Sequence, residues 1–255
     1  KIEVLREEAG KQKRKRESEH RVQILDPATG TGTFLDRTIK YIFSSKFEGQ
    51  KGLWQSYVDE HLLPRLHGFE ILMASYAMAH LKLDITLSET GYDFEKGKGK
   101  RFGVYLTNSL EKPAELNRDL FSQWLSTESV EANKIKKEKP IMVVMGNPPY
   151  SVSSSNASKD DEGNNTWIGE LIEEYKKNLN EKKTNLDDDY IKFIRYAQWF
   201  IERNEEGIVA YITNNSFLDG VTHRQMRKDL LETFDKIFIL NLHGDSIKKE
   251  RTPKG

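Results

Sequence analysis

The 255-residue chain contains no cysteine. A disulfide framework and a thiolate zinc site are therefore excluded. Every reaction that depends on a cysteine nucleophile is excluded as well. Whatever chemistry the chain performs must come from carboxylates, amides, hydroxyls, aromatic rings and the backbone.

Long apolar runs and an excess of either charge are also missing. No stretch approaches the length of a membrane span, and no signal-peptide pattern follows Lys1, so we expect a cytoplasmic protein without membrane attachment. The 40 Lys and Arg residues are balanced by 40 Asp and Glu residues, and the net charge is zero. Because phosphate binding usually leaves a basic footprint, this balance counts against a chain that holds nucleic acid by itself.

The length fits one large α/β domain, or at most two small ones, and a chain this long can bury a core without disulfides or structural metals. Residues 1–20 form a polar segment with a basic run at 11–16, for which a solvated helix face or a frayed end is favoured over a nucleic-acid patch. Residues 21–255 are predicted to form a single domain. This domain is expected to be incomplete, since no closing element follows the last strand pattern.

Strand patterns alternate with helical patterns along the chain. The strand patterns are Val22–Asp26, Leu66–Ile71, Phe102–Leu106, Ile141–Met145, Ile208–Ile212 and Ile237–Leu242. Helical spacing or composition marks residues 34–47, 74–81, 189–203 and 222–234, with a polar, mostly helical insertion at 111–140. This alternation favours an α/β fold of the Rossmann-like kind, a mainly parallel twisted sheet flanked by helices. The Ser-, Asn- and Gly-rich residues 151–166 predict a loop, either a lid or a plain surface loop.

The segment Leu25–Leu35 predicts a strand, a turn and the start of a helix. Gly30 and Gly32 allow a tight turn and a close approach to a ligand, and ligands of open α/β sheets lie at such strand ends. A dinucleotide site would require a third glycine where Leu35 stands. Asp26, directly before the turn, suits a cation or a neutral polar group, such as the sulfonium and amino groups of S-adenosylmethionine. The alternative is a plain turn with a helix-capping threonine.

Two polar residues follow the next strands. Glu70 ends the second strand pattern, a position where an acid commonly binds ribose hydroxyls. A surface glutamate is the alternative. Asn108 follows the third strand pattern, where its side chain is placed to meet the adenine edge of a cofactor. A turn asparagine is the alternative there.

The most informative tetrapeptide is Asn147-Pro148-Pro149-Tyr150, after the fourth strand pattern. The two prolines fix φ and remove two backbone donors, so the backbone is stiff and presents carbonyl groups. Asn147 adds an amide acceptor and donor, and Tyr150 adds a flat ring. Together these groups can accept both hydrogens of an exocyclic amine and stack on the base that bears the amine. A rigid loop without chemistry is the alternative.

Such an arrangement fits direct methyl transfer to nitrogen. An aromatic amine is a poor nucleophile because its lone pair is drawn into the ring. Acceptors on both hydrogens raise the electron density at nitrogen, and positioning against the sulfonium carbon supplies much of the rate. In duplex DNA the target base is stacked and paired, so it must be flipped out.

The sequence resembles the adenine-N6 DNA methyltransferases of restriction–modification systems, in their gamma motif order, over residues 20–245. The resemblance is carried by Asp26–Leu35, Phe69-Glu70, Asn108, Asn147–Tyr150 and Ile212–Leu218. The ending Asn241–Ser246 resembles large single-chain restriction–modification enzymes, including the type ISP group.

The resemblance implies a class I S-adenosylmethionine-dependent methyltransferase fold and methyl transfer to the N6 amino group of adenine. The cofactor contacts that it implies are Asp26, Pro27, Ala28, Thr29, Gly30, Gly32, Phe34, Glu70 and Asn108. The catalytic residues that it implies are Asn147, Pro148, Pro149 and Tyr150. Double-stranded DNA is the expected partner, bound through a target-recognition domain outside this chain, and nuclease and helicase-like domains are possible in the intact protein. A partner strand for Ile237–Leu242 is expected past Gly255.

Several other functions share some of these features. Methylation of cytosine at C5 needs a cysteine and is excluded. N4-cytosine methyltransferases share the amine chemistry but usually carry Ser or Asp in place of Asn147, and RNA and protein-glutamine methyltransferases share the tetrapeptide but usually lack this cofactor turn. A regulatory module that binds S-adenosylmethionine without turnover is the non-enzyme alternative. His223 and His243 lack metal-ligand spacing, so no metal site is expected.

Overall fold

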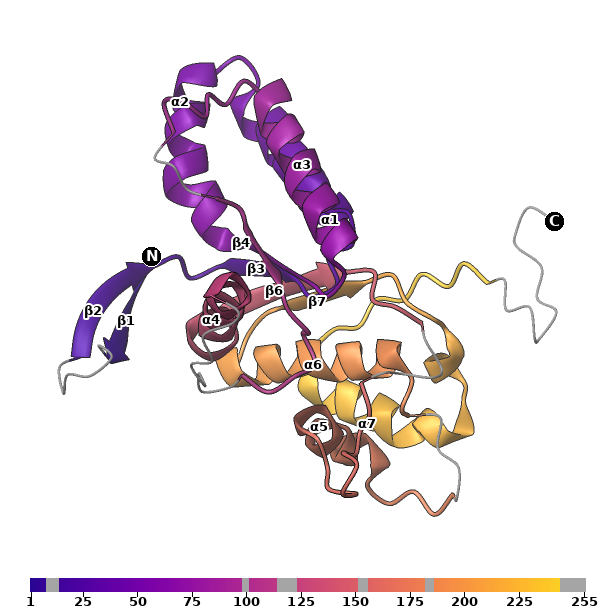
Figure 1. The fold of residues 1–255 in the computed structure, drawn as a ribbon. Coiled ribbons are helices and arrows are strands. Elements are labelled where there is room, and N and C mark those ends of the chain that lie inside the picture. Colours follow the sequence, from indigo (N-terminus) through magenta and orange to yellow (C-terminus); the bar gives the residue numbers. More distant parts are fainter. Residues whose placement is uncertain (8–13, 98–100, 114–122, 151–155, 182–185, 244–255) are drawn as a thin grey trace. The chain divides into compact units, whose positions relative to one another are not determined.

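The computed structural model of the chain describes residues 1–7, 14–97, 101–113, 123–150, 156–181 and 186–243 (Figure 1). The chain divides into two compact units. Unit 1 consists of residues 1–147 and 203–211, and unit 2 of residues 148–202 and 212–255.

The described part of unit 1 contains one five-stranded sheet in the order β5-β4-β3-β6-β7. Its strands are β3 (Gln23–Asp26), β4 (Leu66–Glu70), β5 (Gly103–Leu106), β6 (Ile141–Gly146) and β7 (Ile208–Tyr211). Every neighbouring pair is parallel, which confirms the predicted α/β class. Since β3 is the central strand, its carboxyl end lies between those of β4 and β6.

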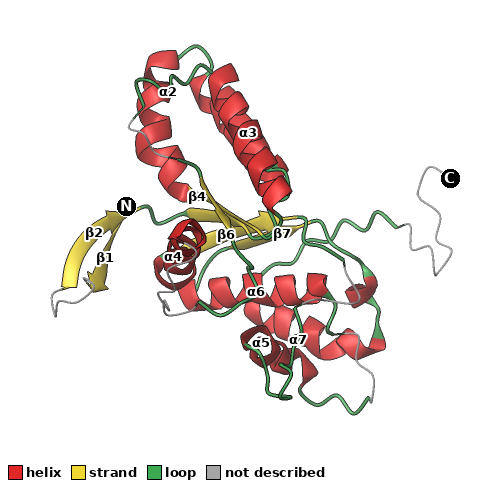
Figure 2. Ribbon diagram, in the orientation of Figure 1, coloured by secondary structure: helices red, strands yellow, loops and turns green. Residues whose placement is uncertain are grey.

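Helices cover both faces of this sheet. Helices α1 (Thr33–Ile42), α2 (Lys51–Tyr57) and α3 (Met73–Glu89) lie on one face, and α4 (Gln123–Glu138) lies on the other (Figure 2). A π-helical turn, Phe43–Phe47, continues α1, and a second one at Val58–Leu62 leads through the short 3-10 helix Leu63–Arg65 into β4. Trp54 anchors the apolar core of the first face, where it is fully buried and donates to Thr90 Oγ1 at 3.1 Å.

The polar N-terminal segment forms a hairpin. Strand β1 (Ile2–Glu7) pairs antiparallel with β2 (Arg14–Glu19) in a separate two-stranded sheet. The predicted solvated helix face or frayed end is therefore wrong for these residues, and residues 11–13 of the basic run lie outside the described residues. In this register Glu7 lies across from Arg14, and Arg6 lies across from Lys15.

Unit 2 is built on helices. Its helices are α5 (Trp167–Lys176), α6 (Asp189–Asn204, of which the last two residues belong to unit 1) and α7 (Arg224–Thr233), with short 3-10 helices at Ser216–Leu218 and Val221–His223. The two helices predicted at 189–203 and 222–234 are confirmed, whereas α5 was not predicted. Helix α6 does not have the single apolar face that its spacing suggests, because every residue from Asp189 to Gln198 is buried.

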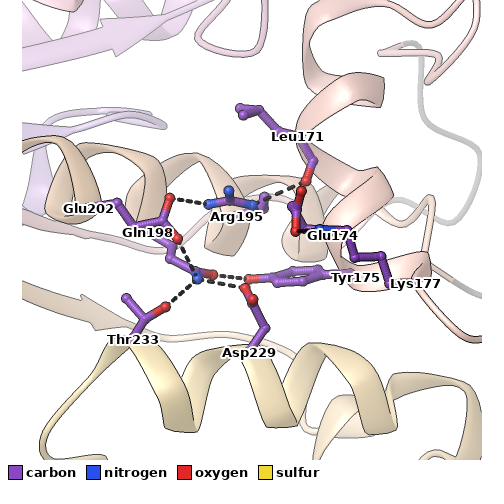
Figure 3. A network of polar contacts seen from close by, with 9 residues as sticks. All are labelled: Leu171, Glu174, Tyr175, Lys177, Arg195, Gln198, Glu202, Asp229 and Thr233. Atoms are coloured by element: carbon purple, nitrogen blue, oxygen red, sulfur yellow. Dashed lines mark hydrogen bonds and ion pairs between the residues drawn. The ribbon is translucent and has the colours of Figure 1, made fainter.

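Gln198 joins the three helices of unit 2 (Figure 3). Its side chain is fully buried, and its Oε1 accepts a hydrogen bond of 2.6 Å from the Tyr175 hydroxyl on α5. Its Nε2 lies 2.8 Å from Glu202 Oε1, 2.7 Å from Asp229 Oδ2 and 2.7 Å from Thr233 Oγ1. An amide nitrogen carries two hydrogens, so these three acceptors share them. Polar bonding at the centre of the helices thus specifies how α5, α6 and α7 meet.

The strand predicted at Ile237–Leu242 is wrong. These residues are irregular, and the side chains of Phe238 and Leu240 are 89% and 85% exposed. A strand requires a neighbour for its N–H and C=O groups, and no described strand pairs with this segment. Of the predicted loop at 151–166, residues 151–155 lie outside the described residues, and 156–166 form a loop with a bridge between Lys159 and Asn165. Within the described residues, no helix has both the length and the apolar character that crossing a membrane requires.

Replacing Gln198 with leucine is expected to destabilise unit 2 by about 2–4 kcal/mol, because buried Tyr175 and half-buried Asp229 and Thr233 lose their hydrogen bonds to the amide. Gln225→Leu on α7 is the matched control and is expected to change stability by less than about 0.5 kcal/mol. Urea unfolding followed by tryptophan fluorescence measures both. An unchanged midpoint for Gln198→Leu would contradict the role of this network.

Candidate functional site

The turn after β3 has the predicted shape. Gly30 and Gly32 adopt the left-handed φ values of +55° and +80°, which residues with a Cβ rarely take. A Cβ on Gly30 would meet nothing within 4 Å, whereas one on Gly32 would lie 3.3 Å from the Cβ of Ala79 on α3. The backbone of the turn is therefore set by conformation at Gly30 and by close helix packing at Gly32, and the space beside Gly30 is open.

Asp26 is the most unusual side chain of this turn. It is fully buried, and its Oδ1 accepts a hydrogen bond of 3.2 Å from the backbone of Ala28, while Oδ2 has no hydrogen-bond partner among the described residues. Burial raises the pKa of Asp26 from 3.8 to about 7, against the hydrogen bond from Ala28, and the nearby charge of Glu70 adds to the rise. A buried carboxylate oxygen without a partner is costly, so it favours a ligand that brings a positive charge or a donor.

Glu70 holds the turn from the neighbouring strand. Its Oε2 accepts from the N–H of Gly30 and its Oε1 from the N–H of Leu72, both at 2.8 Å. The side chain is only 8% exposed, so the alternative of a surface glutamate does not hold. Each carboxylate oxygen has further lone-pair capacity, which leaves the predicted contact with ribose hydroxyls chemically possible.

The other predicted turn residues differ in orientation. Thr29 is buried, and its hydroxyl donates to the carbonyl of Asp26 at 3.0 Å. It does not cap α1, whose N-cap is Gly32, so the alternative of a helix-capping threonine does not hold. Pro27 is buried and Ala28 half-buried, while Phe34 is half-buried on the first turn of α1. Any contact of Thr29 with a ligand would come from its backbone.

Asn108 closes a turn after β5. Its Oδ1 accepts from the N–H of Leu110 at 3.1 Å, and its Nδ2 donates to Glu111 Oε1 at 3.1 Å. The turn-asparagine alternative therefore describes part of what this residue does. The half-buried residue lies at the carboxyl end of β5, two strands from β3, and its contact with a cofactor stays a prediction.

The tetrapeptide begins beside Asp26. Strand β6 pairs with β3 and ends at Gly146, where a Cβ would lie only 2.6 Å from Asp26 Oδ1. Asn147 follows directly, is exposed, and ends unit 1. Two segments that are far apart in the sequence are thus brought together by neighbouring strand ends. No sequence pattern marks Gly146, because only the pairing of β3 with β6 shows that a side chain here would meet the Asp26 carboxylate.

The remainder of the tetrapeptide belongs to unit 2. Pro148 is buried, and Pro149 and Tyr150 are exposed. The Tyr150 hydroxyl donates to the carbonyl of Ile212 at 3.3 Å, and partial burial raises the pKa of Tyr150. This bond ties the tyrosine to the start of Ile212–Leu218, another segment that carries the family resemblance. The residue as a whole is 44% exposed.

Comparison with known proteins identifies the class of this domain. The family model of the Eco57I restriction-modification methylase matches residues 65–247, most of the chain. The chain therefore belongs to the Eco57I restriction-modification methylase family, as the resemblance predicted.

Solved structures of restriction–modification enzymes are similar to the chain. The ATP-dependent type ISP enzyme LlaBIII bound to DNA is 31% identical, with a TM-score of 0.65 over 86% of this chain and 14% of its own. A nuclease-deletion mutant of the type ISP enzyme LlaGI with a DNA substrate mimic is 26% identical, with a TM-score of 0.63 over 84% of this chain and 17% of its own. DrdV in a DNA complex is 29% identical, with a TM-score of 0.62 over 84% of this chain and 19% of its own. The chain thus spans less than a fifth of each of these chains. No curated protein matches it.

The burial of Asp26, whose Oδ2 has no hydrogen-bond partner in the described part of the chain, predicts a specific pH dependence of stability. Because the carboxyl has a higher pKa in the folded than in the unfolded chain, the parent loses stability as pH rises from about 4 to about 7. Asp26→Asn removes this titration. Its free energy of unfolding, relative to the parent, is expected to rise by about 2–3 kcal/mol between pH 5 and pH 8.

Asp36→Asn is the matched control, since buried Asp36 accepts from Thr86 at 2.5 Å and pairs with Lys40 at 2.8 Å. Loss of this paired carboxylate in Asp36→Asn is expected to lower the free energy of unfolding at pH 8. Urea unfolding at the two pH values measures both variants. A pH-independent difference between Asp26→Asn and the parent would contradict the burial of an unpaired carboxyl at this position.

Proposed function

We propose that this chain is the catalytic domain of a DNA methyltransferase that transfers a methyl group from S-adenosylmethionine to the N6 amino group of a flipped-out adenine. The observation that carries this proposal is the buried Asp26 carboxylate, whose Oδ2 has no hydrogen-bond partner among the residues that the structure describes. This carboxylate lies beside Gly146, the residue that precedes Asn147. This geometry supports a cationic methyl donor and an amine acceptor at adjacent strand ends.

The residues around the turn fit S-adenosylmethionine, which would supply an electrophilic methyl group on a sulfonium sulfur. Its ammonium or sulfonium charge would offset the unpaired charge of Asp26. The backbone from Pro27 to Gly32 and the side chain of Phe34 would line the cofactor. Glu70, already bonded to the turn, would accept from the ribose hydroxyls, and Asn108 would meet the adenine edge.

Asn147 and the prolyl backbone would accept the two hydrogens of the target amine. This raises electron density at the nitrogen and orients its lone pair toward the methyl carbon. As the new N–C bond forms, the S–C bond breaks, and the amine then loses one proton to solvent. Pro148 and Pro149 stiffen the backbone that carries the acceptors, and the ring of Tyr150 would stack on the flipped base.

The intact enzyme would require more than this domain. With a net charge of zero, the chain has no excess of cations for phosphates. We propose that a target-recognition domain elsewhere in the protein grips double-stranded DNA, and that nuclease and helicase-like parts share the same restriction–modification enzyme. The DNA-bound type ISP structures that resemble this chain support such an arrangement.

Calorimetric titration with S-adenosylmethionine tests the cofactor site. The parent is expected to bind, and Gly30→Trp and Asp26→Ala are expected to abolish binding, because the first fills the open space and the second removes the countercharge. Gly49→Trp is the matched control, since Gly49 also has a positive φ, of +82°, and open space around its Cβ. Equal binding by Gly30→Trp and Gly49→Trp would place the cofactor elsewhere or nowhere.

Transfer of labelled methyl groups to single-stranded and duplex oligonucleotides tests the reaction. Asn147→Ala is expected to reduce the rate at least about a hundredfold, the typical effect of losing a well-placed polar group, without loss of cofactor binding. Asn165→Ala, in an exposed loop, is the control and should retain the parent rate. Nucleoside analysis is expected to yield N6-methyladenine. Label on cytosine N4 or on protein would overturn the adenine assignment, and cofactor binding by the intact enzyme without any transfer would favour a regulatory module.

A further inference from the structure

The loop after β5, Thr107–Glu111, is bonded to both strands that carry the proposed cofactor contacts. The Thr107 N–H donates to the carbonyl of Glu70 at 2.9 Å, which joins the loop to the end of β4. The Ser109 hydroxyl is buried and donates to the carbonyl of Pro27 at 2.5 Å, which joins the loop to the first turn. The position of the loop therefore depends on two strand ends at once.

A buried lysine supports the same loop from α4. Lys136 is 1% exposed, and its Nζ donates to the carbonyl of Asn108 at 2.7 Å and to that of Glu111 at 3.2 Å. The ammonium also lies 5.5 Å from the ring centroid of Phe69, the residue before Glu70. One side chain thus contacts both ends of the loop turn and the strand next to it.

Burying this cation is unfavourable by itself. Burial lowers the pKa of Lys136 from 10.5 to about 8, against the opposing charge of Glu111. Its two hydrogen-bond acceptors are backbone carbonyls, so the ammonium gives the loop directional bonds that an apolar side chain of the same length could not provide. The hydrogen bonds to the carbonyls of Asn108 and Glu111 offset the cost of burying the ammonium and hold the backbone of Asn108 in one place.

We propose that Lys136 and Ser109 are positioning residues that hold Thr107–Glu111 against the cofactor turn, so that Asn108 is set for the adenine ring of the methyl donor before it binds. This inference rests on the proposed function. The inference extends the proposed function from the residues that would touch the cofactor to two residues that act through them. A loop that is held in its binding conformation loses less freedom on binding, and misplacement by about 1 Å weakens a site severely.

Two ligands separate positioning from general stability. S-Adenosylhomocysteine and S-inosylhomocysteine differ only at the adenine edge, so their affinity ratio reports the placement of Asn108. The parent is expected to prefer the adenine ligand. Lys136→Met and Ser109→Ala are expected to bind it at least about tenfold more weakly and to lose most of the preference, because a displaced loop no longer reads the ring edge. Lys137→Met, an exposed neighbour on α4, is the control and should behave as the parent.

Calorimetry well below the melting temperature of each variant keeps the folded fraction near one, and thermal unfolding verifies this. Variants that melt earlier but retain the parent affinity and ratio would have lost only stability, which would overturn the inference. If Lys136→Met does not fold, Ser109→Ala decides the question alone. If the parent binds and the variants keep its affinity and its affinity ratio, only this inference is overturned. Failure of the folded parent to bind either ligand overturns the proposed function together with it.

Discussion

The parallel pairing of β3 with β4 on one side and β6 on the other is the constraint on which the site depends. Asp26 is in register with Gly68 of β4, and Leu25 is in register with Val144 of β6. Three strand ends therefore meet at one edge of the sheet, and the polar residues that follow them become neighbours. Without this order, Asp26, Glu70 and Asn147 would be three unrelated polar residues in distant parts of the chain.

Missing side chains make room for the polar groups at this edge. A Cβ on Gly146 would lie 2.6 Å from Asp26 Oδ1, and one on Gly68 would lie 2.5 Å from Thr29 Oγ1. The carboxylate of Asp26 is thus enclosed by backbone rather than paired with a cation, which sacrifices stability in the absence of a ligand. The same feature prepares it for a positive charge, because a preorganised, desolvated carboxylate interacts more strongly than a hydrated one.

The two units solve the problem of buried polar groups in opposite ways. In unit 2, Gln198 is surrounded by partners on all three helices, and its bonds specify one arrangement of α5, α6 and α7 (Figure 3). In unit 1, Asp26 is left with one oxygen unpartnered among the described residues. A satisfied buried network is what stability and specificity require, whereas an unsatisfied group at a strand end is what a binding site requires.

The sequence by itself determined the local features. Apolar runs predicted the five strands of the sheet, Gly30 and Gly32 predicted the turn, and the tetrapeptide at Asn147 indicated the chemistry, since each of these depends on residues close together in the chain. Only the tertiary structure showed the N-terminal hairpin, the absence of a strand at 237–242, and the contacts of Glu70 with Gly30 and of Lys136 with the Asn108 loop. Those features depend on partners distant in sequence, and periodicity carries no information about which distant residue supplies a hydrogen bond.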